Sequence, residues 1–409
     1  PNGTRWDPAL GMRFLSLASL LPLGWADCEA SNLIQLPGTS DTVALGIDLH
    51  VKGAAVSFSS PEFSALLPKL DVKMNPMTAS SNNSTTCLQM VQALQNTRPT
   101  SEFPRVIHTG ILVPESDPTL SHWVEPARKL RLLPMSFLAS QDLQHVKLYV
   151  WTNVEQTHPL IQEIFAPLLE QYGKYIEIKR FDAPAEIEKV SSHYESNPES
   201  VSNLTGELVK MYKLQQRMDS KSDLMRACLL YNYGGSWIDM DTLLVQSISP
   251  LLEEDWVSCQ WHWSLNNAIM STSGPRSKFI TAYLGQILSV GVNQDWTAYG
   301  PASLETMKRK IQESVANSTF HALPSCFFES IPLPDAHAAD EEIPPDKEFF
   351  TSTSLESRVK RRNYIDPRRK THSTFALHWY NQWDREVKDS SMANVVEKLY
   401  FELLNIKLK

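Results

Sequence analysis

The sequence lacks the cysteine patterns that cross-link small secreted domains or bind zinc, and it lacks a long apolar run that could cross a membrane. Its 409 residues contain five cysteines, none of them in a Cys-x-x-Cys pair, and the odd count leaves at least one thiol unpaired. This excludes a zinc ribbon and a thioredoxin-type site. No run of about 20 apolar residues occurs, so the sequence predicts no well-formed membrane-spanning helix. Cys228 lies on an apolar helical face and is predicted to be a buried small hydrophobe.

The chain is also short of positive charge. It has 38 basic and 46 acidic residues, a net charge of -8, and 42% of its residues are hydrophobic. Such a composition is that of a globular protein large enough to bury a core without disulfides or metals. Because the field of the whole molecule repels phosphate backbones, we expect no nucleic-acid partner.

The amino-terminal region contains one shorter apolar run, MRFLSLASLLPLGWA, which starts at Met12. A basic residue, an apolar stretch and a small-x-small site follow in the order of a secretory signal, although a short buried helix is the alternative. With a signal in 1–26, residues before Met12 would not belong to the natural protein, and we expect the secretory pathway, either the Golgi lumen or secretion. Glycosylation sequons occur at Asn2, Asn82, Asn83, Asn203 and Asn317, and the last four would be usable in a secreted protein, which supports this weakly.

The remaining chain divides into a predicted stem or accessory region, 27–100, and an ordered domain, 101–409. Runs rich in Val and Ile predict buried strands at 103–112, 146–153 and 175–181, and the stretch 159–172 is predicted to be helical. Strands alternating with helices indicate an α/β fold with a mostly parallel sheet and helices on both faces. Ligands bind at the carboxyl ends of the strands in such folds.

The most informative segment is residues 221–245, KSDLMRACLLYNYGGSWIDMDTLLV. An apolar stripe at i, i+3, i+4 and i+7 predicts a helix, with Ser222 as its N-cap and Gly234 and Gly235 as its end. A short strand, 236–238, then leads into two carboxylates. The residues of the stripe are Leu224, Ala227, Cys228 and Tyr231.

Asp239 and Asp241 follow that short strand at i and i+2, and in extended chain both side chains would point the same way. Paired carboxylates at a strand end hold a divalent ion, act as nucleophile and acid, or cap a turn. Asp223 and Arg226 lie three apart in what the sequence predicts as the first helical turn, so they form either a surface ion pair or part of the same cleft.

The blocks SDLMR, LLYNYGG and SWIDMD resemble the DxD-containing region of the family 32 glycosyltransferases. That family is kin to α1,4-galactosyl- and N-acetylglucosaminyltransferases, yeast-type mannosyltransferases, glucosylating toxin domains and capsule-synthesis transferases. Shorter similarities extend from about 103 to 384 and comprise FPRVIHTGI, NAIM from Asn267, YGP from Tyr299, and HW at His378 through Trp383.

This resemblance implies a GT-A type fold, that is, a mostly parallel nucleotide-binding sheet flanked by helices. It also implies a retaining transfer of a hexose or N-acetylhexosamine from a nucleotide sugar, with a UDP-sugar favoured, to a glycan or glycolipid acceptor. A cation stabilises the charge that develops on the leaving diphosphate. Hard oxygen ligands favour Mn²⁺ or Mg²⁺ over zinc.

The resemblance also implies roles for single residues. Asp241 would hold the metal, and Asp239 would reach the ribose and the water shell of the metal. Asp223 and Arg226 would grip the hydroxyl groups of the donor sugar. The other implied donor-binding residues are Asn267, His378 and Trp383, of which the last two would close over the metal and diphosphate, unless they are a partly buried His and a core Trp.

Two further features allow a functional interpretation. Trp261 and Trp263 share one face of a predicted strand, where they either stack on an acceptor sugar or pack in the core. The basic cluster 358–370 follows the acidic stretch 340–348. This pair is either two solvated loops or a contact site for an anionic acceptor or a membrane surface.

Two rival functions stay open. The sequence WIDMDTLL imitates the opening motif of haloacid-dehalogenase phosphohydrolases, in which Asp239 would be the nucleophile and Asp241 the general acid. That motif normally ends a long apolar strand near the start of its domain. Here only Trp237 and Ile238 separate the Gly-Gly turn from Asp239, which lies deep in the chain. The other rival is a catalytically silent sugar-binding protein on a transferase fold.

Overall fold

The computed structural model describes residues 91, 94, 105–114, 124–194, 198–252, 254–259, 265–314, 320–323, 327–328, 349–350, 366–368, 374–379, 383 and 385–406. Several predicted features lie outside these residues. They are the signal segment, nearly all of 27–100, the sequons other than Asn203, Trp261 and Trp263, the acidic stretch 340–348 and most of the basic cluster 358–370. Val91 and Leu94, within the predicted stem, are fully buried in the core.

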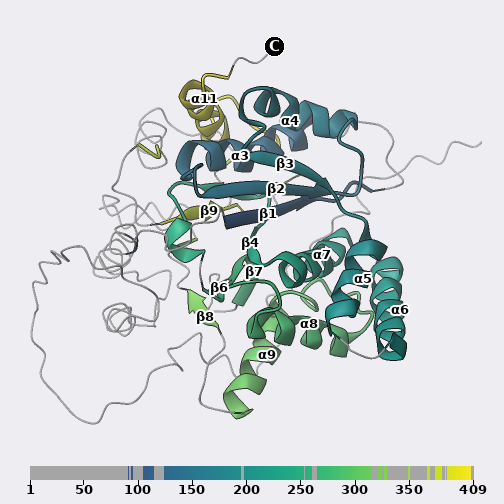
Figure 1. Ribbon diagram of the computed structural model, residues 1–409. Helices are drawn as coiled ribbons and strands as arrows, with labels where there is room; N and C mark the ends of the chain where they lie inside the picture. Colours follow the sequence, from purple (N-terminus) through teal and green to yellow (C-terminus); the bar gives the residue numbers. More distant parts are fainter. Residues whose placement is uncertain are drawn as a thin grey trace, which may run out of the picture.

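The core of the fold is a seven-stranded sheet in the order β3-β2-β1-β4-β7-β6-β8 (Figure 1). The strands are β1 (Arg105–Ile111), β2 (Val146–Thr152), β3 (Ile176–Arg180), β4 (Gly235–Ile238), β6 (Trp256–Cys259), β7 (Leu265–Thr272) and β8 (His321–Leu323). The first four strands in this order are mutually parallel, and β7 pairs antiparallel with both β4 and β6. The predicted α/β class with a mostly parallel sheet is therefore confirmed.

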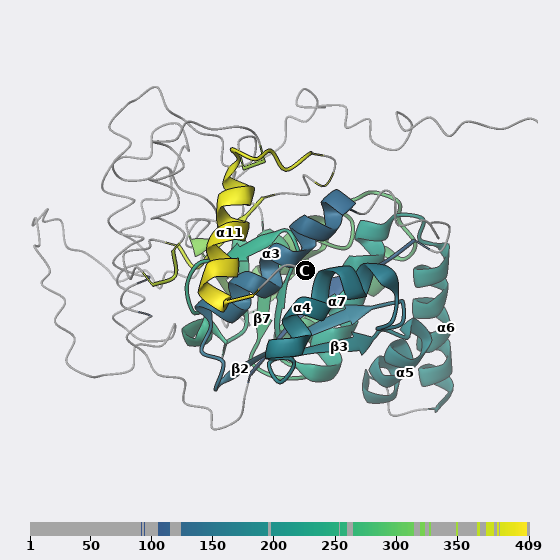
Figure 2. The same ribbon diagram turned by 90° about the horizontal axis from the view of Figure 1, so that it is seen from above.

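Helices cover both faces of the sheet, as Figures 1 and 2 show. One face carries α3 (Val124–Ser140), α4 (Pro159–Tyr172) and α11 (Met392–Leu404). The other carries α5 (Ala183–Tyr194), α6 (Pro198–Leu214), α7 (Met218–Tyr233), α8 (Lys278–Val290) and α9 (Pro301–Ser314). Two hydrophobic cores result, one on each face. Among the described residues, no helix is both long and apolar enough to cross a membrane.

The helix before the aspartates begins earlier than the sequence predicted. It starts at Met218 with Arg217 at the N-cap, so Ser222 is not the cap, and Asp223 and Arg226 do not lie in the first turn. Asp219 occupies that turn, where its carboxylate accepts a hydrogen bond from the backbone N–H of Ser220 at 2.7 Å. The helix is also buried on more than its predicted stripe, because it lies between the sheet and its neighbouring helices. Cys228 is free and buried, as predicted.

The two glycines after α7 turn the chain into the centre of the sheet, as predicted. Gly234 has φ 68° and Gly235 has φ 82°, a region that favours glycine. A Cβ atom on Gly235 would lie 2.4 Å from the carbonyl oxygen of Val106 in β1. This close approach lets β4 pair directly with β1.

A second, two-stranded sheet follows the aspartates. It consists of β5 (Thr242–Leu244) and β9 (Ala376–His378), paired antiparallel with Thr242 opposite His378. The Trp379 N–H extends this pairing by donating to the Asp241 carbonyl at 3.0 Å. A segment near the carboxyl end of the chain is thereby fixed beside the aspartates.

Candidate active site

The aspartate pair lies in a tight turn at the carboxyl end of β4, not in extended chain as the sequence predicted. The Asp239 N–H donates to the Ala268 carbonyl of β7 at 2.8 Å, and the Thr242 N–H donates back to the Asp239 carbonyl at 3.1 Å. The chain turns here because the central sheet ends at Ile238 and β5 leaves it to pair with β9. As a result, the two carboxylates have different partners.

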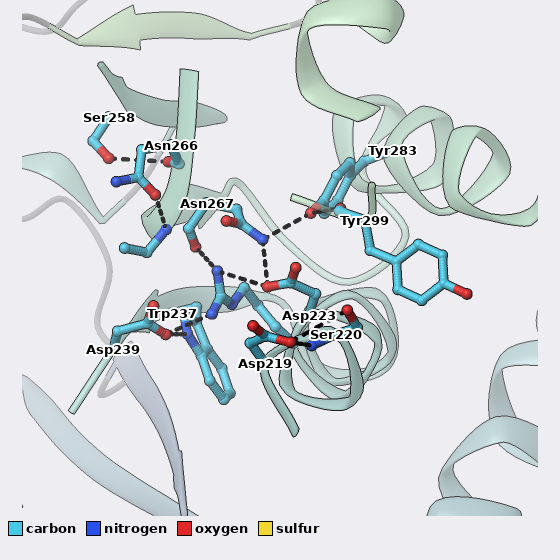
Figure 3. Close-up of polar contacts among 12 residues, drawn as sticks. Asp219, Ser220, Asp223, Trp237, Asp239, Ser258, Asn266, Asn267, Tyr283 and Tyr299 are labelled. Atoms are coloured by element: carbon cyan, nitrogen blue, oxygen red, sulfur yellow. Dashed lines mark hydrogen bonds and ion pairs between the residues drawn. The ribbon is translucent and has the colours of Figure 1, made fainter. Parts of the chain in front are cut away.

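Asp239 points towards α7 (Figure 3). Its Oδ1 accepts hydrogen bonds from Arg226 Nη2 and from Trp237 Nε1, both at 2.6 Å. The Arg226 guanidinium also lies over the Trp237 ring, 5.1 Å from its centroid. Burial raises the pKa of Asp239, while Arg226 opposes that rise and Asp241 adds to it.

Arg226 joins the two acidic parts of the site. Besides Asp239, its guanidinium lies 3.5 Å from Asp223 Oδ1 and donates to the Asn267 carbonyl of β7. Burial alone would lower the pKa of Arg226, but the Asp239 and Asp223 carboxylates more than offset this, so the pKa is raised. The i,i+3 pair on α7 is therefore buried and part of the site, and the alternative of a surface pair is wrong.

Asn267 supports this arrangement from β7. Its side-chain N–H₂ donates to Asp223 Oδ1 at 2.8 Å and to the Tyr283 hydroxyl at 3.1 Å. Tyr283 in turn donates to the Tyr299 carbonyl at 2.6 Å. Figure 3 shows the side chains of Asp223, Asn267 and Tyr283 directed towards one another.

The buried setting alters the titration of Asp223. Burial raises its pKa to about 7, although Arg226 acts in the opposite direction. A carboxyl group in this range changes its charge near neutral pH, which is unusual for an aspartate and typical of functional sites.

The second carboxylate, Asp241, faces the carboxyl-terminal segment. Asp241 Oδ2 lies 3.1 Å from His378 Nε2, and both side chains are almost fully buried. Trp383 belongs to the same carboxyl-terminal part of the chain. Its ring packs edge-on against Trp379 at 4.6 Å, and its carbonyl accepts a hydrogen bond from the buried Lys129 of α3 at 3.1 Å.

The structure thus brings Asp223, Arg226, Asp239 and Asn267 into one hydrogen-bonded cluster and places Asp241 with His378 beside it. Trp383 packs against Trp379. Sequence reasoning missed Trp237 and Tyr283 as supporting residues. Trp237 alternates with Asp239 along the chain, which was a usable signal, whereas Tyr283 occupies an ordinary apolar helical position. Gly300, in the predicted YGP element, packs so closely that a Cβ atom would lie 2.8 Å from the Asn267 side-chain oxygen.

The residues present fit a divalent cation held together with a phosphate ligand. No group of three or more His, Cys, Asp or Glu side chains among the described residues is arranged to hold a metal by itself. Mg²⁺ and similar ions commonly use one or two carboxylates and complete their shell with water and substrate phosphate. Asp239 and Asp241 would supply the carboxylates of such a site, and His378 lies next to Asp241.

One family model matches part of the chain. Residues 126–258 match the family model described as the glycosyltransferase sugar-binding region containing a DXD motif. The matched segment runs from α3 to β6 and includes Asp223, Arg226, Asp239 and Asp241, whereas Asn267 and His378 lie beyond it. The match supports a glycosyltransferase function for this chain. No curated protein matches the sequence.

Solved glycosyltransferase structures are similar at low identity. The galactosyltransferase LgtC, in complex with donor and acceptor sugar analogues, aligns with a TM-score of 0.36 and 12% identity over 74% of this chain and 97% of its own. PaToxG glycosyltransferase aligns with a TM-score of 0.33 and 12% identity, over 57% of this chain and 79% of its own. The catalytic domain of alpha-toxin from Clostridium novyi aligns with a TM-score of 0.25 and 10% identity, over 63% of this chain and 79% of its own. Similarities at this level define neither substrate nor mechanism.

Proposed function

We propose that this protein is a metal-dependent glycosyltransferase of GT-A type, related to family 32, which acts in the secretory pathway. It transfers a hexose or N-acetylhexosamine from a nucleotide sugar, most simply a UDP-sugar, to a glycan or glycolipid. The observation that carries the proposal is the cluster in which Arg226 bridges Asp223 and Asp239 at the carboxyl end of β4.

The proposed roles follow from these contacts. Asp241 and Asp239 would hold Mn²⁺ or Mg²⁺, with His378 beside them, and the bound cation supplies positive charge for the leaving diphosphate. Asp223 and Arg226 would bind the hydroxyl groups of the donor sugar, and Asn267 fixes Asp223 by its 2.8 Å hydrogen bond. Desolvation of these groups strengthens their interaction with a charged donor.

The same contacts bear on stereochemistry. A double displacement with retention requires a free carboxylate close to the anomeric carbon. Asp239 Oδ1 accepts from Arg226 and Trp237, and Asp223 Oδ1 accepts from Asn267, so the protein's own groups hold one oxygen of each carboxylate. We propose retention by return of the acceptor on the face from which the diphosphate departs, which is the mechanism that the resemblance to family 32 implies.

The decisive experiment compares two aspartates. The donor is first identified by screening nucleotide sugars for metal-dependent hydrolysis in the absence of acceptor. Asp241→Asn should reduce hydrolysis of that donor by at least about 100-fold, because the substitution removes a proposed metal ligand. Asp219→Asn on α7 is the matched control, since its carboxylate is exposed and pairs with Arg217. The control should keep full activity. Full activity of Asp241→Asn with Mn²⁺ would contradict the metal role.

The rival functions give different results in two further measurements. Calorimetry of UDP binding should show a dependence on Mn²⁺ in the wild type, and a protein that binds UDP without hydrolysing any donor would be a silent sugar-binding protein. A phosphohydrolase would form an aspartyl-phosphate analogue on Asp239 with beryllofluoride, whereas the proposed transferase forms none.

A further inference from the structure

A side-chain amide joins the segments that follow β1 and β2. Asn153 comes directly after β2, and Val113 lies two residues beyond the end of β1. The Val113 N–H donates to Asn153 Oδ1 at 2.8 Å, and Asn153 Nδ2 donates to the Val113 carbonyl at 2.8 Å. One side chain thus binds both backbone groups of Val113, beyond the point where the pairing of β1 with β2 ends. We call these two hydrogen bonds the Asn153 clamp.

Asn153 is itself held at the end of β2. The Thr152 carbonyl accepts from the Phe181 N–H at 2.8 Å, which ties this end of β2 to the chain that leaves β3. Thr152 is buried, and its hydroxyl oxygen accepts from the Val154 N–H at 3.3 Å. The Val154 side chain packs against the hydrophobic core that contains Val113. Because the residues on both sides of Asn153 are fixed, its amide is held in position by contacts other than those to Val113.

The clamp lies at the switch point of the sheet. From β1 the chain proceeds outward through β2 to β3, whereas β4 lies on the other side of β1 (Figure 1). In open α/β sheets, ligands bind in the crevice outside the carboxyl ends of the strands between which the order reverses, here β1 and β4. By this rule, one wall of the crevice is the turn with Asp239 and Asp241. The other wall is the segment after β1, which the clamp holds.

The two walls are also joined by packing between β1 and the site. A Cβ atom on Gly110 of β1 would lie 2.9 Å from Cη2 of Trp237 in β4, and still closer to the Met225 side chain of α7. Trp237 is the residue whose Nε1 donates to Asp239 Oδ1. A glycine at position 110 therefore lets the Trp237 ring pack against β1, so the position of Asp239 depends on the strand that leads into the clamp.

We propose that Asn153 is a positioning residue of the donor site. By clamping Val113, it holds the segment after β1 as the wall against which the nucleotide half of the donor binds. The inference rests on the proposed function, since the proposed sugar-binding residue Asn267 lies on β7, beyond β4, and leaves the β1 side for the nucleotide. The clamp acts by preorganisation, because a wall that is already ordered costs less to order when the ligand binds.

Asn153→Ala removes both hydrogen bonds of the clamp. We expect the Kd of UDP, measured by calorimetry with Mn²⁺, to rise roughly tenfold. The KM for the donor identified by the hydrolysis screen should rise similarly, while kcat changes less than about twofold, because Asn153 does not contact the reacting atoms. A residue with a purely structural role would lower stability without this division between KM and kcat.

The matched control is Gln141→Ala. Gln141 is a buried amide that also bridges two backbone groups, since its Nε2 donates to the Gln246 carbonyl at 2.8 Å and its Oε1 accepts from the Ile248 N–H at 2.9 Å. It precedes β2, whereas Asn153 follows that strand. The control should lose at least as much stability in urea unfolding as Asn153→Ala and should keep the Kd of UDP.

Hydrogen exchange tests the clamp without any measurement of activity. The amide of Val113 should exchange at least about tenfold faster in Asn153→Ala than in the wild type, because it loses its acceptor. In the wild type, UDP with Mn²⁺ should slow exchange in residues 105–114. Exchange in α6, which packs on α5 away from the sheet, should not change.

The outcomes separate this inference from the proposed function. If the wild type binds no UDP and hydrolyses no donor, the proposed function fails, and the assignment of the crevice to a nucleotide fails with it. If the wild type binds UDP and Asn153→Ala binds it equally well, or if Gln141→Ala loses the same affinity, the inference alone is overturned. If Asn153→Ala does not fold, the wild type decides, since exchange in 105–114 that UDP slows supports the inference and exchange that UDP leaves unchanged overturns it.

Discussion

At the scale of single residues, the candidate site depends on how Asn267 is held. Its backbone carbonyl accepts from Arg226, while its side chain donates to Asp223 and Tyr283. One residue of β7 thus fixes both Asp223 and Arg226 of α7. Because Tyr283 donates onward to the Tyr299 carbonyl, its hydroxyl hydrogen points away from Asp223, and the oxygen is left to accept from Asn267.

Tyr283→Phe therefore tests the support of the site. Removing the hydroxyl leaves a buried carbonyl and an amide N–H without their partner, so unfolding should become easier by about 1–2 kcal/mol. We expect donor turnover to fall roughly tenfold, because Asn267 no longer fixes Asp223. Tyr400→Phe is the control, since that buried tyrosine of α11 also donates to a backbone carbonyl, Leu244, at 3.2 Å. It should lose similar stability and retain turnover, and equal turnover losses in both variants would refute the role of Tyr283.

Asp223 gives a pH prediction at the same scale. Burial raises its pKa to about 7, whereas an aspartate in the unfolded chain titrates near 3.9. At a pH between 3.9 and about 7, the folded state keeps a proton on Asp223 that the unfolded state has released. The stability that Asp223 contributes is therefore present at acidic pH and is lost as the pH rises through about 7. The loss should amount to roughly 2–4 kcal/mol. Urea unfolding of wild type and Asp223→Asn from pH 4 to 8 measures it, and parallel pH profiles for the two proteins would rule it out.

At the scale of elements, the unit that matters is α7, the two glycines and β4. His108 of β1 donates from Nε2 to the Gly234 carbonyl at 3.0 Å, while its Nδ1 accepts from Trp151 Nε1 at 3.0 Å. Burial lowers the pKa of His108 to about 4, so this residue stays neutral and keeps both hydrogen bonds at neutral pH. The turn into β4 is therefore fixed from the neighbouring strand.

Gly235→Ala should disturb this unit. The new Cβ atom would lie 2.4 Å from the Val106 carbonyl at a φ of 82°, so we expect a loss of about 1–3 kcal/mol in unfolding free energy and weaker UDP binding. Gly206→Ala provides the opposite control, because Gly206 lies inside α6 with no atom within 4 Å of the added carbon. It should stabilise the protein by about 0.5–1 kcal/mol. Thermal unfolding and calorimetry measure both effects, and a harmless Gly235→Ala would show that the turn has room to adjust.

At the scale of the whole molecule, the sequence predicted the parallel half of the sheet well. The runs at β1, β2 and β3 and the helix α4 were found within one or two residues, because buried parallel strands are rich in Val and Ile. Strands such as β5, β8 and β9 have three residues each and carry no such pattern. The start of α7 was missed because Arg217 provides no side-chain cap.

The charged residues of the candidate site could be predicted from the sequence, whereas the residues that hold them in place could not. The spacing of four charged residues resembles that of a sugar-transfer site. In the structure Asp223, Arg226 and Asp239 form one cluster, and Asp241 lies beside it. The turn that separates Asp239 from Asp241 could not be read from the sequence, since it depends on β5 leaving the sheet to pair with β9. Tyr283 and the close approach of Gly300 depend on tertiary packing between α8, α9 and β7 and leave no local signal.

The pairing of β5 with β9 has a consequence for protein synthesis. Arg226, Asp239 and Asn267 lie within about 40 residues of one another, so a growing polypeptide can assemble them once β7 has left the ribosome. Asp241 meets His378 only after another hundred or so residues have been translated. Under the proposed function, an unfinished chain would hold the sugar-binding residues and both proposed metal ligands, and Asp241 would acquire its His378 neighbour only when translation reaches β9.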